Sequence, residues 1–82
     1  MHATERTIRK RVALEVRAEM TRKEITAQVL AQRLRWGEAT LGRRLRAERP
    51  FPVEDLIALC YELRVDPTAL IERAVSQQSA AA

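Results

Sequence analysis

Two short amphipathic segments, separated by only three residues, constrain the fold of this chain more than any other feature. Residues 27–34 carry apolar side chains at helical spacing, and residues 38–47 carry Leu41 and Leu45 four positions apart. Gly37, in the gap between them, has no Cβ and can leave the helical basin at little cost. So short a connection predicts a sharp angle between two helices, which is the helix-turn-helix arrangement.

The rest of the sequence is also helical in character, and we predict an all-α fold of five helices. Only two glycines occur, and no segment carries a β-hairpin signal. Apolar residues at helical spacing predict helices at about 5–22 and 53–63. Thr26 is well placed to cap the helix at 27–34. Asp66 as N-cap and Pro67 at the first helical position open a fifth helix.

The 82 residues of the chain predict one domain without a membrane segment. We expect this domain at 1–75, with the helix-turn-helix at about 26–47, and a disordered tail at 76–82. No apolar run approaches the roughly 18 residues that a membrane span needs. The N-terminus is too charged for a secretory signal, so the expected compartment is the cytoplasm. Cys60 is the only cysteine, which excludes an internal disulfide.

Positive charge is concentrated in the first part of the chain. Residues 1–49 contain 13 Lys and Arg against 6 Asp and Glu, a balance of +7, whereas residues 50–82 contain 2 against 5, a balance of −3. The two balances add up to the net charge of +4. Such asymmetry favours one face that binds a polyanion. A basic surface that only keeps the protein soluble is the alternative.

The densest basic stretch lies at the end of the segment 38–47. Four arginines fall within seven positions, and Glu48 is the only acid among them. A solvated helix face would normally alternate the two charges. The cluster consists of Arg43, Arg44, Arg46 and Arg49.

Residues 25–70 resemble the lambda-repressor/Cro-like (XRE-type) helix-turn-helix family, and in particular an actinobacterial and phage-like subgroup. The resemblance depends on "IT" at the start of the second helix, "LA" within it, "ATL" at the start of the third, and "PFPVEDLIALCYELRVDPTALI". Arg35 and Ala47 stand where the family usually has glycine. Ala27 stands where it often has a phosphate-binding Gln, with Gln28 next in the chain.

The resemblance implies that the helix at 38–47 lies in the major groove of DNA. With Leu41 and Leu45 facing inward, the expected base contacts are Glu38, Ala39, Gly42 and Arg43, where Arg43 can bridge guanine O6 and N7. Gly42 would leave room for close approach to the DNA. The expected phosphate contacts are Gln28, Arg33, Arg35, Thr40, Arg44, Arg46 and Arg49. The alternatives are a solvated face for these arginines and, for Arg44, a stem packed on the core.

These observations predict a sequence-specific, double-stranded DNA-binding transcription regulator that acts at an operator. We expect a homodimer on two half-sites, with Leu70, Ile71 and Val75 of the fifth helix as the candidate dimer surface. No catalytic cluster and no metal-ligand spacing occur in the sequence, so we expect neither an enzyme nor a cofactor or small-molecule substrate. The alternatives are an excisionase-like architectural DNA-binding factor and an antitoxin-type protein-interaction module.

Overall fold

Five α-helices make up the chain in the computed structural model, which describes the backbone of residues 2–81 and the side chains of residues 4–76. No strand occurs within the described backbone, so the prediction of an all-α, five-helix fold is confirmed. The helices are α1 (His2–Arg22), α2 (Ala27–Leu34), α3 (Glu38–Leu45), α4 (Val53–Leu63) and α5 (Pro67–Ala81).

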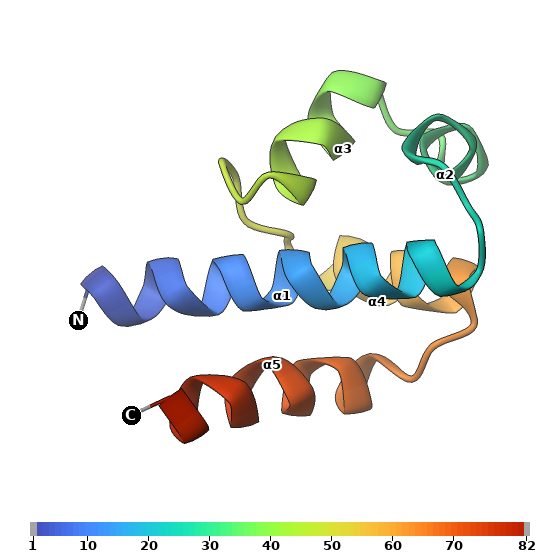
Figure 1. The fold of residues 1–82 in the computed structure, drawn as a ribbon. Helices are drawn as coiled ribbons and strands as arrows, with labels where there is room; N and C mark the ends of the chain where they lie inside the picture. The colour runs from blue at the N-terminus through green and yellow to red at the C-terminus, as the bar shows by residue number, and fades with distance from the viewer. Residues whose placement is uncertain (1, 82) are drawn as a thin grey trace.

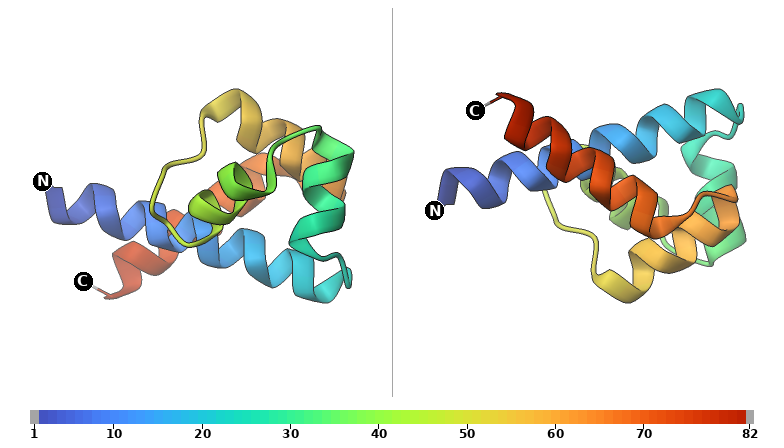
Figure 2. Two further views of the ribbon diagram at one scale, coloured as in Figure 1. Left: turned by 90° about the horizontal axis from the view of Figure 1, so that it is seen from above. Right: turned by 90° about the horizontal axis from the view of Figure 1, so that it is seen from below.

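Helix α1 runs through the middle of the molecule and separates two groups of helices. In Figure 1, α5 lies along one side of α1, whereas α2 and α3 lie on the opposite side, with α4 behind α1. The views from above and below agree with this order, because α3 faces the viewer in one and α5 in the other (Figure 2). Helices α2 and α3 therefore form a two-helix unit that projects from a base made of α1, α4 and α5.

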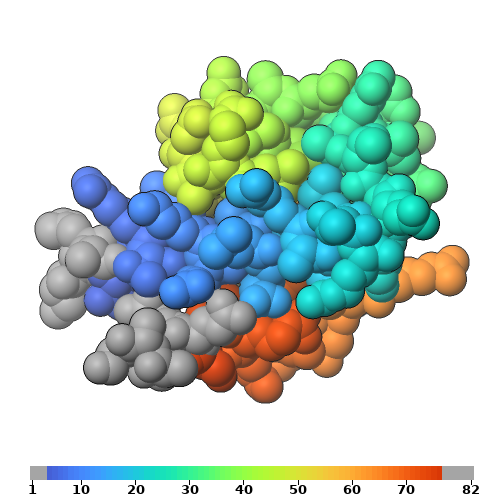
Figure 3. All heavy atoms as spheres, viewed as in Figure 1, coloured from blue at the N-terminus to red at the C-terminus, as the bar shows by residue number. Residues whose placement is uncertain are grey.

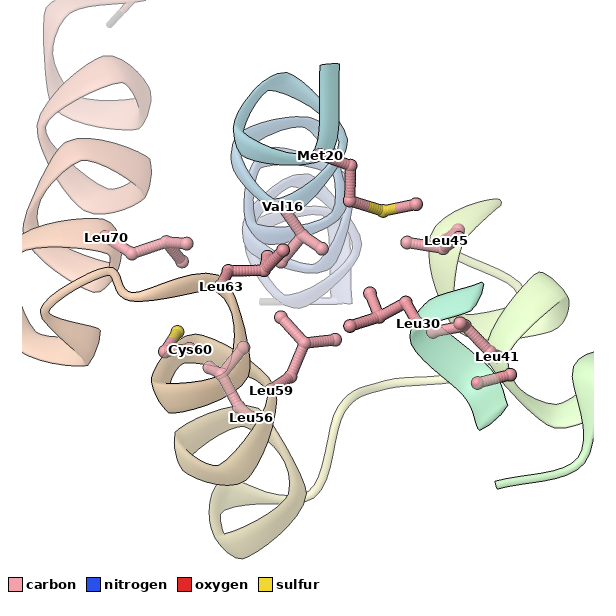
Figure 4. Close-up of a cluster of buried hydrophobic side chains, with 11 residues drawn as sticks. Val16, Met20, Leu30, Leu41, Leu45, Leu56, Leu59, Cys60, Leu63 and Leu70 are labelled. Carbon is pink, nitrogen blue, oxygen red and sulfur yellow. The ribbon is translucent and has the colours of Figure 1, made fainter. Parts of the chain in front are cut away.

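One hydrophobic core joins all five helices, as Figure 4 shows. Leu30 of α2 and Leu41 of α3 are fully buried in it beside Leu59 of α4. A core of this kind holds the projecting unit at a fixed angle to its base, because each buried side chain contacts several elements at once. Its members are Val16, Met20, Leu30, Ala31, Leu41, Leu45, Leu56, Leu59, Cys60, Leu63 and Leu70.

Three helix limits differ from the sequence-based prediction. Helix α1 begins at His2 rather than at residue 5, and α3 ends at Leu45 rather than at residue 47. Helix α5 continues to Ala81, into the segment that we predicted to be a disordered tail. Ala82 lies outside the described residues, as do the side chains from residue 77 onward.

Two non-glycine residues provide the left-handed turns at the ends of α2 and α3. Arg35 has φ 60° and Ala47 has φ 61°, although this conformation costs roughly 1–2 kcal/mol for a residue with a Cβ. The backbone N–H of Trp36 bonds to the carbonyl oxygen of Ala31 at 2.9 Å, as in a helix end closed by glycine. Gly37 has φ −67° and ψ 141°, which other residues also adopt. The sharp turn therefore depends on Arg35 rather than on Gly37.

Cys60 carries a fully buried thiol, and we expect its burial to make the folded protein less stable at alkaline pH. Burial raises its pKa to about 11, and the charges of Asp66 and Glu19 add to the increase. The unfolded chain loses this proton at lower pH than the folded protein. The stabilisation is therefore complete below the unfolded pKa and disappears as the pH rises towards 11.

We expect the free energy of unfolding of the natural chain to fall by roughly 2 kcal/mol more than that of Cys60→Ala between about pH 8 and 10.5. Urea unfolding followed by circular dichroism at both pH values measures this difference. Cys60→Ala itself loses some stability at both pH values, because a small cavity remains, but without the extra pH dependence. Parallel decreases in the two proteins would contradict the prediction.

Candidate nucleic-acid interface

Helix α3 has a buried inner face and an open outer face. Leu41 and Leu45 are buried, at 0% and 9% exposure, and they attach the helix to the core. Gly42 is half-buried. Figure 3 shows α3 and the loop that follows it at the upper surface of the molecule. The other sequence-predicted residues of this helix outside the arginine cluster are exposed: Glu38, Ala39 and Thr40.

Helix α2 and the turn after it place further predicted residues at the surface. The hydroxyl of Thr26 accepts a hydrogen bond from the backbone N–H of Val29 at 3.2 Å, which confirms the predicted N-cap. Gln28 near the start of α2, Arg33 in its last turn and Arg35 just after it are all exposed. These three side chains are open to a ligand.

Arg44 differs from the other arginines of the cluster, because its side chain is only 16% exposed. Its Nη1 donates a hydrogen bond to Oδ2 of Asp55 at 2.9 Å. The guanidinium also lies over the ring of Trp36, 4.9 Å from its centre. Arg44 therefore links α3 to the turn before it and to the first turn of α4. We expected a phosphate contact here, but the guanidinium is largely buried and is paired with Asp55.

We expect Arg44→Ala to lower the free energy of unfolding by roughly 1–2 kcal/mol, because it removes both the ion pair and the cation–π contact. Asp55→Asn should cause part of this decrease in the free energy of unfolding, whereas Glu54→Gln in the same helix turn should leave the free energy nearly unchanged. Thermal unfolding of the three variants measures the difference. Arg49→Ala, an exposed arginine of the same cluster, is the matched control, and an equal loss of stability there would contradict the assignment.

Arg46 pairs with the one acid of the cluster. Its Nε donates to Oε2 of Glu48 at 2.7 Å, and both side chains are exposed. This hydrogen bond lowers the pKa of Glu48, and the positive charges of Arg46 and Arg43 lower it further. The guanidinium of Arg46 also covers Gly42, since a Cβ on Gly42 would lie 3.1 Å from Nη1. The room that we expected at Gly42 for the DNA is therefore occupied by Arg46.

The structure brings three arginines of the cluster together around a hollow of about 300 Å³. Thr40, Arg43, Arg44, Arg49 and Pro50 line it, and none of these residues is acidic. Arg43 and Arg49 are exposed there, and the Thr40 hydroxyl adds a donor. A positive hollow with a hydroxyl suits an anion such as a phosphate group.

The N-terminal half of α1 extends the basic surface beyond α3. Arg6, Arg9 and Lys10 lie around Ala47, the residue that turns the chain away from α3. Arg17 also lies beside Arg46 and Ala47, along a neighbouring hollow. These cations belong to the positively charged segment of the sequence, but only the packing of α1 against α3 places them next to the cluster.

Among the residues that the structure describes, no group of three or more His, Cys, Asp or Glu residues is arranged to hold a metal ion. None of the described helices is both long and apolar enough to cross a membrane.

The basic surface formed by α3, the turn before it and the start of α1 is therefore the candidate functional site. Comparisons with known proteins add no assignment to it, since no family model, no curated protein and no solved structure matches the chain.

Proposed function

We propose that this protein is a sequence-specific, double-stranded DNA-binding transcription regulator, with α3 as the helix that enters the major groove. The observation that carries the proposal is the outer face of α3, which is open to solvent and contains Arg43 beside short side chains. B-form DNA has a major groove about 12 Å wide, which admits one α-helix. An α-helix with its side chains is about 10–12 Å across, so α3 fits this width.

The charge around α3 supports a polyanionic partner. The exposed arginines include Arg33 in the last turn of α2, Arg35 just after it, and Arg49 in the loop after α3. Phosphate contacts from such positions fix the register of a protein on DNA, whereas base edges are read from the groove. Gln28 and Thr40 complete the proposed set of phosphate contacts. Arg44 is left out of this set because it is paired with Asp55, and Arg46 because it is paired with Glu48.

A regulator made of one module this small gains affinity from two half-sites, and we propose a homodimer on a two-fold symmetric operator. Ile71 and Val75 of α5 are 40% and 42% exposed and are available to a second copy. Leu70 is fully buried in the core, so our prediction that it belongs to the dimer surface is wrong. The proposal places the protein with the DNA in the cytoplasm and requires no cofactor.

Fluorescence anisotropy of labelled duplexes tests the proposal. We expect DNA from the gene's own upstream region to bind more tightly than scrambled DNA of the same length. With three phosphate-binding arginines per protomer, the slope of log K against log salt should be about −2.7 per half-site. This corresponds to roughly 40-fold weaker binding per half-site between about 50 and 200 mM salt.

Three other outcomes would contradict the regulator. Equal binding to both duplexes together with strong bending would indicate an architectural factor. Affinity without salt dependence would show that the basic surface does not contact phosphates. No binding even at about 20 mM salt would indicate that the basic surface meets an acidic protein, as in an antitoxin-type module.

A further inference from the structure

Arg46, the C-cap residue of α3, forms an exposed ion pair with Glu48 in the loop that follows, and its guanidinium lies beside Gly42. The Nε–H of Arg46 is used by Glu48 at 2.7 Å. The two Nη groups carry four more N–H donors. Both lie close to the surface of α3 at Gly42, with Nη1 at 3.1 Å and Nη2 at 3.8 Å from an ideal Cβ on that residue.

We propose that Glu48 positions Arg46 to read a guanine in the major groove, as a second base-reading arginine beside Arg43. This inference rests on the proposed DNA-binding function and goes beyond it. Guanine presents O6 and N7 as two neighbouring acceptors, which match two N–H groups of one guanidinium. A guanidinium held in place by Glu48 loses less conformational entropy on binding than a free one.

The pairing with Glu48 favours a base over a phosphate as the partner of Arg46. The carboxylate of Glu48 lies 2.7 Å from the guanidinium and would repel a phosphate group brought to the same place. A guanine is neutral, so the carboxylate costs little there. The carboxylate of Glu48 would repel a phosphate, and it also orients the guanidinium of Arg46 for a base. Both effects favour guanine, so we assign Arg46 to the base contacts rather than to the phosphate contacts that we predicted.

Gly42 completes the arrangement because it leaves the space in which the guanidinium lies. An alanine there would place its Cβ 3.1 Å from Nη1, closer than ordinary van der Waals contact. The flexible end of Arg46 would then move outward. Alanine is also a better helix former than glycine, so Gly42→Ala should raise the melting temperature. A loss of base preference in Gly42→Ala would therefore not be caused by a loss of stability.

Selection from a random duplex library, followed by anisotropy with single-base variants of the selected DNA, tests the proposal. Besides the guanine assigned to Arg43, we expect a second guanine whose replacement weakens binding of the natural protein roughly tenfold. Arg46→Ala should abolish discrimination at that position, and Glu48→Ala and Gly42→Ala should reduce it severalfold. Glu48→Ala should bind mixed-sequence DNA at least as tightly as the natural protein, since it has lost a negative charge.

Arg49→Ala is the control, with an equal loss of affinity for every sequence. Uniform weakening by Arg46→Ala, combined with unchanged base preference in Glu48→Ala and Gly42→Ala, would overturn the inference and make Arg46 a phosphate contact. That result would leave the proposed regulator in place. Failure of the natural protein to select any sequence would instead overturn the proposed function, and the reading of guanine with it.

Discussion

Leu41→Ala should lower the free energy of unfolding by about 3 kcal/mol, the largest effect that we expect from a single substitution in this protein. Leu41 is fully buried and attaches α3 to the core. Truncation removes apolar contact and leaves a cavity, because the neighbouring helices close it only in part. An 82-residue domain has little stability to spare, so the melting temperature should fall by about 12–24 °C.

Leu14→Ala is the matched control, since it makes the same chemical change in a helix of the same protein. Leu14 is 48% exposed on α1, and its loss should cost about 1 kcal/mol or less. Thermal and urea unfolding, followed by circular dichroism, measure both variants. Equal losses would show that α3 is not held by the side chain of Leu41, and would remove the basis for a fixed recognition surface.

Local signals in the sequence were sufficient to locate most helix limits. The predicted limits of the second and fourth helices agree with α2 (Ala27–Leu34) and α4 (Val53–Leu63). Each begins at a recognisable residue, Thr26 as N-cap and Pro52 before the first helical turn. The end of α3 was predicted two residues late, because Ala47 adopts a left-handed conformation that nothing in its residue type indicates.

The helical period predicts which residues share one face of a helix. It does not predict which residues of other helices or turns that face will contact. Sequence spacing brought the four arginines together, yet it gave no sign that Arg44 would meet Asp55, eleven positions later, and the ring of Trp36. That contact depends on where the packing of α4 against α2 and α1 places its first turn. The sequence shows that Glu48 is close to the arginines. It does not show that the guanidinium of Arg46 lies over Gly42.

Burial was also only partly predictable from periodicity. Val53 belongs to the apolar spacing of the helix at 53–63, but it is 72% exposed because it lies at the first residue of α4, where the helix projects beyond the core. Leu70 was expected at a dimer surface and is fully buried. In a domain this small, the limits of the core depend on how the helices cross, which the pattern of one helix cannot show.

Arg43→Ala should reduce discrimination between native and scrambled DNA roughly tenfold or more, the largest functional effect that we expect. Arg43 is exposed on the outer face of α3, and a bidentate contact to guanine contributes about 1–3 kcal/mol of discrimination. Arg49 lies in the loop after α3. It lines the same hollow as Arg43, but it is not part of the helix. Arg49→Ala should therefore weaken binding to all sequences alike.

The two arginines are distinguished by base preference and by salt dependence measured together. Arg49→Ala should make the slope of log K against log salt less steep by about 0.9, the value expected for one lost phosphate contact. Arg43→Ala should leave this slope nearly unchanged, since its proposed partner is a base. Both side chains are exposed, so both variants should keep the melting temperature of the natural protein. A reduced slope with unchanged base preference in Arg43→Ala would show that Arg43 contacts a phosphate, and the base contacts of α3 would then have to come from its other outward residues.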